Sequence, residues 1–352
     1  MRLGDIKTRV DLHDLGEFNP IWKGIYSPLY DESFVRKYIH DQFLENSTTY
    51  IERYQNLALW AEYLKLAQQF FPFKDDNLHI VDIGSGSGNT VFPLLDSYPN
   101  AYIVASDLSL PLLKALKDYY EANYHSNNCL IMQLNAEDMI FEKESIDLVV
   151  GGAILHHLFD PSKTLTECYK MLKPGGVAVL FEPFEIGNQI VSIIFEQLVQ
   201  INDMYLSIDT PDDSTWEKKF FRRKSPNKPV EKIPPKIVDF FKAWSFDLKA
   251  RQGTDKSDPK FQNMDDKWLF THHYFASLKR SIGFKKMIIF PLNKDFQHLF
   301  FEQINIYLKI VFGTGISELP QWAIDNIQEL DGHFSYELRQ DLMTEGGIVF
   351  IK

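Results

Sequence analysis

The chain has few of the features that mark several large classes of protein. Its 352 residues include 2 cysteines, Cys129 and Cys168, too few for a disulfide framework or a cysteine metal cluster. No apolar run is long enough to span a bilayer, and the first residues lack the apolar core of a signal peptide. A formal net charge of -11 leaves no basic excess. We therefore expect a cytoplasmic protein with no metal site, no membrane partner and no nucleic-acid partner.

The composition is otherwise that of a soluble globular protein. Hydrophobic residues make up 45% of the chain and charged residues 24%, which is close to the usual balance. This length allows one elaborated domain or two small ones, with ample core. The aromatic content of 14% is high and indicates aromatic-lined cavities as well as core.

The most informative stretch lies between residues 78 and 89. Leu78 begins a short apolar run that is typical of a buried strand, and Gly84, Gly86 and Gly88 interrupt the pattern before a helix begins near Thr90. A strand, a glycine-rich turn and a helix N-terminus form the first half of a nucleotide-binding α/β unit. Glycine is needed in such a turn because the backbone bends sharply and a ligand approaches it closely.

Two residues indicate which ligand this turn binds. The dinucleotide fingerprint G-x-G-x-x-G would need glycine at position 89, which is Asn89 here. Asp82 precedes the first glycine by two residues, and its carboxylate would repel a pyrophosphate but attract a cationic ligand. S-adenosylmethionine (SAM) carries a sulfonium and an ammonium and no phosphate. The loop therefore favours SAM over a nicotinamide dinucleotide.

The stretch from 78 to 183 alternates strands with helices. Further strands are expected at 101–107, 129–134, 146–151 and 177–181, with helices between most of them. Such alternation predicts a parallel sheet with helices on both faces. Asp107 ends the second strand roughly twenty residues after the loop, where an acidic side chain accepts hydrogen bonds from ribose hydroxyls.

These blocks together resemble the class I SAM-dependent methyltransferases. The resemblance covers 78–183 and rests on the glycine loop and further blocks in the family's order, namely Asp107-Leu108-Ser109, Asn135-Ala136-Glu137-Asp138, Asp147-Leu148-Val149, His156-His157-Leu158 and Leu172-Lys173-Pro174-Gly175-Gly176. It implies a Rossmann-like, mostly parallel sheet of seven strands whose last strand is antiparallel. The sixth and seventh strands would be 285–291 and 347–352.

The resemblance also implies a cofactor site. Asp82 and the glycine loop would hold the methionine end of SAM, Asp107 the ribose, and Ala136 with its neighbours the adenine. The family usually has aspartate where this chain has Asn135, whose amide oxygen accepts a hydrogen bond without the assistance of charge. The expected cofactor residues are Asp82, Gly84, Ser85, Gly86, Gly88, Asp107, Leu108, Asn135, Ala136, Glu137 and Gly152.

Four segments are expected around this site. They are an N-terminal helical lid (1–77), the SAM-binding α/β core (78–184), a substrate cap insertion (185–280), and the last two strands of the core with a second helical insertion (281–352). Insertions at the carboxyl ends of parallel strands cover the crevice where ligands bind, so we expect a helical cap over the active site.

Three residues are candidates for proton transfer. His156 and His157 follow the fourth strand, and Glu182 ends the fifth. Imidazole titrates near neutral pH, so either histidine suits a general base, and His157 is preferred by its position in the family. Packing histidines and a lid salt bridge from Glu182 remain open alternatives.

Two other groups of charged or polar residues have simpler interpretations. His272-His273 is interpreted as a solvated helix face. The basic cluster of Lys218, Lys219, Arg222, Arg223 and Lys224 is interpreted as a solvated loop, and alternatively as a contact for an anionic substrate or an acidic carrier protein.

The sequence thus predicts a SAM-dependent methyltransferase acting on a small, apolar or aromatic molecule, in specialised metabolism. Transfer to oxygen, nitrogen or carbon stays open, as does the choice between a monomer and a homodimer. Two alternatives remain: a nicotinamide-dependent oxidoreductase on the same fold, and a non-catalytic SAM-binding scaffold.

Overall fold

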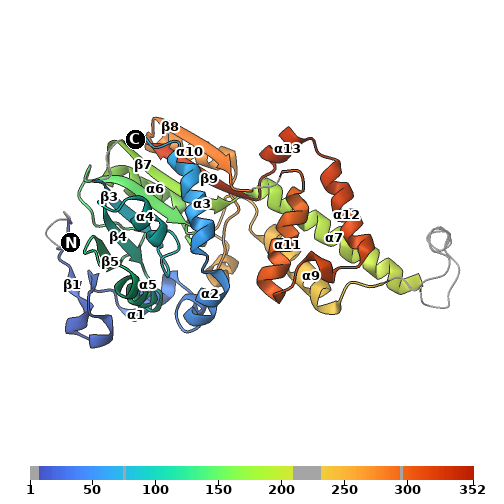
Figure 1. Cartoon of the computed structure of the whole chain (residues 1–352), viewed down its shortest axis with the longest axis horizontal. Helices are drawn as coiled ribbons and strands as arrows, with labels where there is room; N and C mark the ends of the chain where they lie inside the picture. The colour runs from blue at the N-terminus through green and yellow to red at the C-terminus, as the bar shows by residue number, and fades with distance from the viewer. Residues whose placement is uncertain (1–7, 74–76, 209–230, 294–295) are drawn as a thin grey trace. The chain divides into compact units, whose positions relative to one another are not determined.

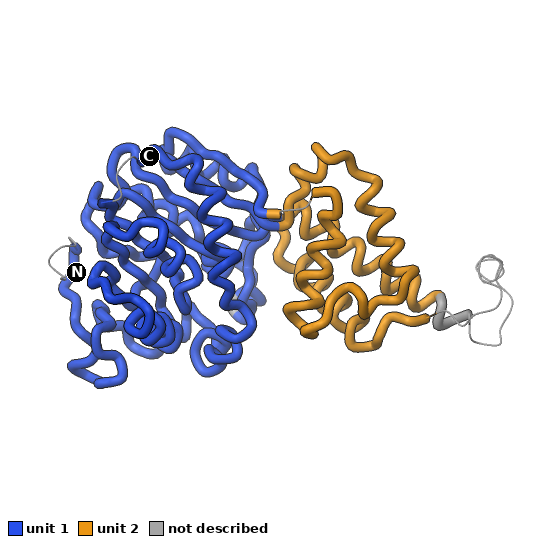
Figure 2. The backbone as a smooth tube through the Cα atoms, viewed as in Figure 1, with its two compact units in different colours: residues 1–184, 253–292, 345–352 blue, residues 185–252, 293–344 orange. Residues whose placement is uncertain are grey.

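The computed structural model describes residues 8–73, 77–208, 231–293 and 296–352, and the chain divides into two compact units. Unit 1 comprises 1–184, 253–292 and 345–352, and unit 2 comprises 185–252 and 293–344 (Figure 2). The segment expected as one cap insertion, 185–280, is therefore shared between them. Each unit is described by itself.

Unit 1 is built around a nine-stranded sheet in the order β1-β2-β5-β4-β3-β6-β7-β9-β8 (Figure 1). The strands are β1 (His13–Asp14), β2 (Ile25–Ser27), β3 (His79–Ile83), β4 (Tyr102–Asp107), β5 (Cys129–Gln133), β6 (Ile146–Gly152), β7 (Leu172–Pro183), β8 (Lys286–Pro291) and β9 (Glu345–Ile351). Strands β5, β4, β3, β6 and β7 run parallel, and β9 pairs antiparallel with both β7 and β8. The Rossmann-like sheet and its antiparallel last strand confirm the predicted fold class.

The strand count differs from seven because two short strands extend one edge. β2 pairs parallel with β5, opposing Ile25 to Ile131, and β1 pairs antiparallel with β2. The sequence pattern of residues 1–77, which contain both short strands, predicts a mostly helical segment. A strand of three residues contains too little alternation to be detected, and here Ile25 is buried by its contact with the sheet.

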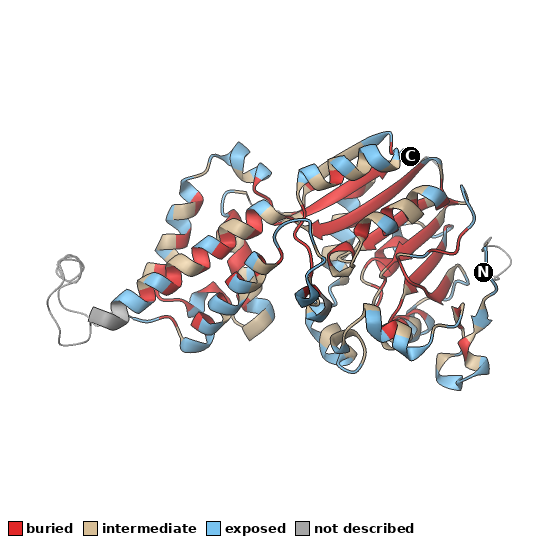
Figure 3. Cartoon of the chain, turned by 180° about the vertical axis from the view of Figure 1, so that it is seen from behind, coloured by how far each residue is buried: buried red, intermediate tan, exposed pale blue. Residues whose placement is uncertain are grey.

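Helices cover both faces of the sheet, as the alternation of the sequence predicts. Figure 3 shows that the strands of the sheet are mostly buried. On one face, Ile80, Ile103 and Leu148 share an apolar cluster with residues of α3, α4 and α5. On the other face, α10 places Phe275 against Phe350 of β9, with ring centroids 6.1 Å apart. The helices of unit 1 are α1 (Glu32–Tyr38), α2 (Ser47–Tyr54), α3 (Leu57–Gln68), α4 (Val91–Ser97), α5 (Leu110–Asn123), α6 (Pro161–Met171) and α10 (His272–Ile282), with 3-10 turns η2 (Leu15–Glu17), η3 (Pro20–Trp22), η4 (Asp41–Phe43), η5 (Leu155–His157) and η6 (Pro259–Asn263).

Unit 2 is helical in its described residues. Its elements are α7 (Glu185–Ile208), α9 (Pro235–Ala250), α11 (Leu299–Phe312), η7 (Ile316–Glu318), α12 (Gln321–Gly332) and α13 (Tyr336–Asp341). Near the start of α7, the side chains of Val191, Ile194 and Leu198 are buried. Phe195 of the same helix stacks on Phe241 of α9 with ring centroids 4.3 Å apart, so this face of α7 forms core of the unit.

Two sequence features are placed by these bounds. His272 and His273 are exposed at the start of α10, as expected for a solvated helix face. The basic cluster at 218–224 lies outside the described residues. Among the helices that the structure describes, none combines the length and the apolar character needed to cross a bilayer.

Candidate active site

The three glycines of the loop after β3 differ in what surrounds them. All three have positive φ, at +64° for Gly84, +52° for Gly86 and +98° for Gly88. A Cβ at Gly84 would lie 2.6 Å from Ile154, and one at Gly88 would lie 2.3 Å from Phe92. A Cβ at Gly86 would meet only the tip of Leu112, at 4.0 Å. Gly84 and Gly88 thus permit internal packing, and Gly86 is the position where the loop faces open space.

Asp82 presents a buried carboxylate beside this loop. It is fully buried at the carboxyl end of β3, and neither of its side-chain oxygens has a hydrogen-bond partner among the residues that the structure describes. Burial raises the pKa of Asp82 to about 7, although the nearby hydroxyls of Ser85 and Thr90 act to lower it; Asp107 adds a smaller increase. An unpaired buried carboxylate is unstable unless it is protonated or faces a cation. A ligand that carries an ammonium fits this position.

Asp107 connects the end of β4 to the glycine loop. Its Oδ2 accepts a hydrogen bond from the backbone N–H of Gly86 at 2.9 Å, and its Oδ1 accepts one from Ser109 at 2.8 Å. Burial raises the pKa of its carboxyl group. A carboxylate has about four lone-pair sites, so each oxygen keeps a site for a ribose hydroxyl. Leu108, the next residue, is buried.

The segment after β5 contains the residues expected near the adenine. Asn135 is buried, its Oδ1 accepts from the backbone N–H of Glu137 at 3.0 Å, and its own N–H donates to the Tyr30 hydroxyl at 3.3 Å. Ala136 is buried beside it. The Glu137 carboxylate instead accepts from the backbone N–H of Asp160 at 3.2 Å. The side chain of Glu137 is therefore engaged with the loop after η5.

Two other expected cofactor residues have clear packing roles. Ser85 donates from Oγ to the carbonyl of Asp82 and accepts from the N–H of Ser106, which joins the ends of β3 and β4. A Cβ at Gly152 would lie 2.6 Å from the ring of Trp60, so glycine there allows α3 to approach β6.

The N-terminal helices are attached directly to the glycine loop. Asn89 Oδ1 accepts from the N–H of Asn56 at 2.9 Å, and its amide donates to the carbonyl of Tyr54 at 3.2 Å. The residue that excluded the dinucleotide fingerprint thus holds the junction of α2 and α3. Sequence reasoning missed this role, because a lone asparagine carries no signal for its partner.

Glu182 and His156 form a buried pair at the ends of β7 and β6. Glu182 Oε1 accepts from the backbone N–H groups of Ile154 and Leu155, at 3.1 and 2.7 Å. Its Oε2 lies 2.7 Å from His156 Nδ1. Since a carboxylate only accepts, Nδ1 donates a proton to Glu182, and Nε2 is the ring nitrogen on the other side.

His157 lies beside this pair in a different environment. Its Nδ1 is 3.0 Å from the carbonyl oxygen of Asp265, and its ring packs against Phe43 at 5.2 Å. Burial, followed by the neighbouring His156, lowers the pKa of His157 to about 3. The ring is therefore neutral near pH 7, with its Nδ1–H donated to a backbone carbonyl.

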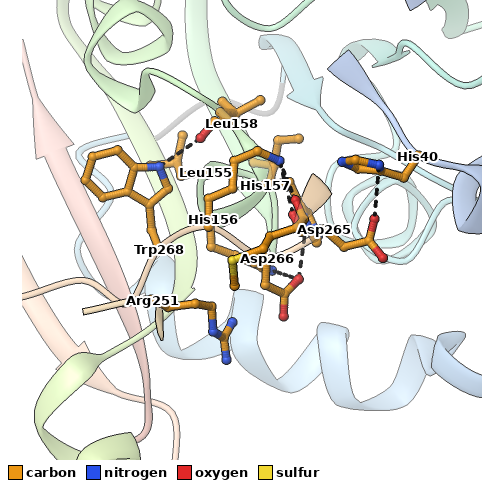
Figure 4. A network of polar contacts seen from close by, with 12 residues as sticks. His40, Leu155, His156, His157, Leu158, Arg251, Asp265, Asp266 and Trp268 are labelled. Atoms are coloured by element: carbon orange, nitrogen blue, oxygen red, sulfur yellow. Dashed lines mark hydrogen bonds and ion pairs between the residues drawn. The ribbon is translucent and has the colours of Figure 1, made fainter. Parts of the chain in front are cut away.

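A strap formed by residues 264–268 crosses both histidines. The backbone N–H groups of Lys267 and Trp268 donate to the carbonyl of His156, at 2.7 and 3.2 Å, and the Trp268 indole donates to the carbonyl of Leu158 at 2.8 Å (Figure 4). The strap brings Asp265 and Asp266 to the site. Sequence reasoning missed both, because adjacent acidic residues in a loop usually indicate only a solvated surface.

Lys267 is the buried cation of the strap. Its Nζ donates to the carbonyl of Met264 at 2.8 Å and lies 4.6 Å from the centre of the Phe159 ring. Burial lowers the pKa of Lys267 to about 8. The strap therefore brings charge of both signs to the two histidines.

The structure brings the predicted residues into two groups in unit 1. Asp82, Gly86 and Asp107 lie together at the ends of β3 and β4, joined by the hydrogen bond from Gly86 to Asp107. His156, His157 and Glu182 lie together at the ends of β6 and β7. Both groups occupy the carboxyl edge of the parallel strands, where open α/β sheets bind ligands.

Comparison with known proteins supports the family suggested by the sequence. Residues 81–180 match a family described as a methyltransferase domain. The mitochondrial 2-methoxy-6-polyprenyl-1,4-benzoquinol methylase of Caenorhabditis elegans is 28% identical over 137 residues, which are 38% of this chain and 47% of that protein. The tRNA N(3)-cytidine methyltransferase METTL2 of Mus musculus is 29% identical over 126 residues, covering 34% of this chain and 32% of the other.

The chain is also similar to solved structures. Phosphoethanolamine N-methyltransferase 2 of Haemonchus contortus, in complex with S-adenosylhomocysteine, superposes with a TM-score of 0.48 and 13% identity, covering 88% of this chain and 57% of the other. The chain spans less than half the length of the two curated relatives named above. The residues matched by the methyltransferase-domain family, 81–180, include the glycine loop, Asp107 and the two histidines. This chain therefore carries a methyltransferase domain of the class I SAM-dependent family.

Proposed function

We propose that this chain is a SAM-dependent methyltransferase whose acceptor is a small molecule. The observation that carries the proposal is the Asp82 carboxylate, buried and without a partner among the described residues beside an open face of the glycine loop. The ammonium of SAM would pair with this carboxylate, whereas the phosphates of a dinucleotide would be repelled by it. The methyltransferase family of residues 81–180 supports the same cofactor.

Bound SAM would supply a methyl group that is already activated by its positive sulfonium. The work left to the protein is to hold the cofactor and the acceptor in line and to exclude water. Asp82 would orient the methionine end, Asp107 the ribose, and the segment 135–137 the adenine. Of these, Asp107 has a second task, because its hydrogen bond to Gly86 fixes the loop against β4.

We propose His156 as the group that takes a proton from the acceptor when one must be removed. Its Nε2 has a lone pair, and Glu182 stabilises the imidazolium that forms when this nitrogen is protonated. The family position favours His157, but its lowered pKa makes it a weak base. Glu182 would act as a positioning residue, and His157 as a neighbour that packs between Phe43 and the strap.

An apolar or aromatic acceptor is supported by the rings near the histidines. Phe43 contacts both Tyr50 and His157, with centroid distances of 5.0 and 5.2 Å. These rings come from the N-terminal segment, in keeping with its predicted role as a lid. A net charge of -11 disfavours a nucleic-acid acceptor, although several relatives are tRNA methyltransferases.

The cofactor proposal is tested by calorimetric titration with SAM, S-adenosylhomocysteine and NAD. We expect the first two to bind and NAD not to bind. Binding of NAD alone would instead favour the oxidoreductase alternative. A cytoplasmic location, a homodimer and a carrier-protein partner stay predictions from the sequence.

A further inference from the structure

Three possible metal ligands from two segments meet beside Glu182. His156 and His157 come from η5, and Asp266 comes from the strap at 264–268. Asp266 Oδ1 lies 3.2 Å from His157 Nδ1 and 3.7 Å from His156 Nε2 (Figure 4). One ligand atom from each residue lies within 4.8 Å of those from the other two. All three residues belong to unit 1.

The hydrogen bond from His156 to Glu182 is a second, independent observation that points to a metal site. Histidines that bind metals usually donate their other ring N–H to a carboxylate, which fixes the tautomer and makes the ligating nitrogen more basic. His156 Nδ1 donates to the buried Glu182 in this manner, and Nε2 on the other side of the ring lies 3.7 Å from Asp266 Oδ1.

We infer that His156, His157 and Asp266 bind a divalent transition-metal ion. Bonds of about 2.0–2.2 Å place two ligands of one tetrahedral ion roughly 3.3–3.5 Å apart. The two spacings to Asp266 Oδ1, 3.2 and 3.7 Å, are close to this value. Two imidazoles and one carboxylate suit zinc, iron or cobalt and leave a coordination position for water or an acceptor atom. No metal site was expected from the sequence, because Asp266 is more than a hundred residues from the histidines.

The surrounding charges and hydrogen bonds set the conditions for binding. The Asp265 carboxylate faces His40 at 3.9 Å and adds negative charge, whereas Lys267 adds positive charge but donates to the Met264 carbonyl. His157 Nδ1 currently faces the carbonyl of Asp265, so coordination through this nitrogen gives up that hydrogen bond and moves the ring proton to Nε2.

Ion binding does not require the proposed activity, but it changes how that activity would work. Without the ion, His156 Nε2 is the proton acceptor. With the ion bound, the same atom is a ligand, and a hydroxyl in the open position loses its proton more easily because the cation lowers its pKa. This second statement rests on the proposed function.

The test uses the untagged, full-length chain, since a histidine tag would itself bind the probe. The protein is treated with a chelator, dialysed, and titrated with Co²⁺ near neutral pH while visible absorption is recorded. We expect one Co²⁺ per chain with the absorption of a tetrahedral site, and its displacement by Zn²⁺. Asp266→Ala should weaken binding by about tenfold or more, and Glu182→Gln by roughly 10–100-fold.

Asp265→Ala is the matched control, because it removes the adjacent carboxylate and keeps the backbone carbonyl. Its affinity for Co²⁺ should stay within about threefold of the parent. Asp266 is 38% exposed at its side chain, so its replacement should not disturb folding, and Asp266→Asn provides a second variant. Circular dichroism and SAM affinity check that each variant is folded.

Failure of the inference is distinct from failure of the proposed function. The absence of stoichiometric Co²⁺ binding to the parent, or equal affinities in Asp266→Ala and Asp265→Ala, would overturn the metal site even if SAM binds. Co²⁺ binding that depends on Asp266, in a protein that does not bind SAM, would leave the metal site standing and overturn the methyltransferase proposal.

Discussion

His156 Nδ1 lies 2.7 Å from Glu182 Oε2, and the same carboxylate accepts the backbone N–H groups that open η5. One buried side chain at the end of β7 therefore fixes both the backbone after β6 and the tautomer of its histidine. As a result, Nε2 is the ring atom of His156 that can take up a proton or bind an ion. The acceptor side of the proposed reaction depends on this relationship.

Replacement of His156 should separate base catalysis from simple alignment. If the acceptor must lose a proton, His156→Gln should lower turnover by roughly 10²–10⁴-fold, because glutamine cannot take up a proton. The affinity for SAM should be unchanged. His157→Gln is the matched control and should retain most of its turnover, since the pKa of His157 is lowered to about 3. Turnover of both variants is measured with a chelator present. A larger loss of turnover in His157→Gln than in His156→Gln would make His157 the base.

The Asp82 carboxyl should make stability depend on pH. Its pKa in the folded protein, about 7, is raised above the value of about 3.9 for an unfolded chain. The resulting contribution to stability is fully present below about pH 4 and is lost as the pH rises through about 7. Asp82→Asn removes this loss and should exceed the parent in free energy of unfolding by a few kcal/mol at about pH 8, but not at about pH 4.

Denaturant unfolding at the two pH values checks this prediction. Asp138→Asn, which removes an exposed carboxylate after β5, should show no such dependence on pH. A difference between Asp82→Asn and its parent that stays the same at both pH values would mean that Asp82 is not the group responsible.

A methyl group at Gly86 should leave the protein folded but weaken its binding of SAM. A Cβ there has room within the protein. In the proposed site, the open space that it would enter is occupied by SAM. We expect Gly86→Ala to weaken SAM binding by at least about tenfold, or ~1.4 kcal/mol. Gly175→Ala is the matched control, because Gly175 also has positive φ, at +82°, and a Cβ there meets nothing within 4 Å. Each variant should lose roughly 1–2 kcal/mol of stability from backbone strain. Equal SAM affinities in the two variants would contradict the position given to the cofactor.

Asp107 should contribute to SAM binding through its hydrogen bonds. Asp107→Asn keeps one acceptor oxygen for the loop but replaces the other with a donor, so the affinity for SAM should fall by about 1–3 kcal/mol. Asp138→Asn removes the same charge at an exposed position and controls for long-range attraction to the cationic cofactor. Calorimetry distinguishes the two, and a loss shared equally by both would indicate only a general charge effect.

The fold, and the meeting of the glycine loop, Asp82 and Asp107 at one edge of the sheet, could be predicted because their signals are local. The glycine loop, Asp82 and Asp107 occur within one strand–turn–helix–strand unit, and the alternation of strands and helices fixes their common edge of the sheet. The last strand β9 was also placed correctly, as a second apolar run after a helical insertion.

The acceptor side could be predicted only in part. His156, His157 and Glu182 follow strands and were found, but the strap at 264–268 reaches them through tertiary hydrogen bonds that no periodic pattern encodes. The strands β1 and β2 could not be predicted because they are too short to show alternation. The hydrogen bond between Asn89 and Asn56, at the junction of α2 and α3, is likewise a tertiary contact that no pattern encodes.

The central claim is methyl transfer from SAM, and it is tested most directly with SAM labelled on its methyl group. The parent chain and Asp82→Asn are each incubated with labelled SAM and a metabolite extract of the source organism, and also with total tRNA. The account predicts label in a small molecule, with release of S-adenosylhomocysteine, in the parent and not in Asp82→Asn. Label in tRNA would contradict the proposed acceptor class. A parent chain that neither binds SAM nor transfers its methyl group would contradict the account as a whole.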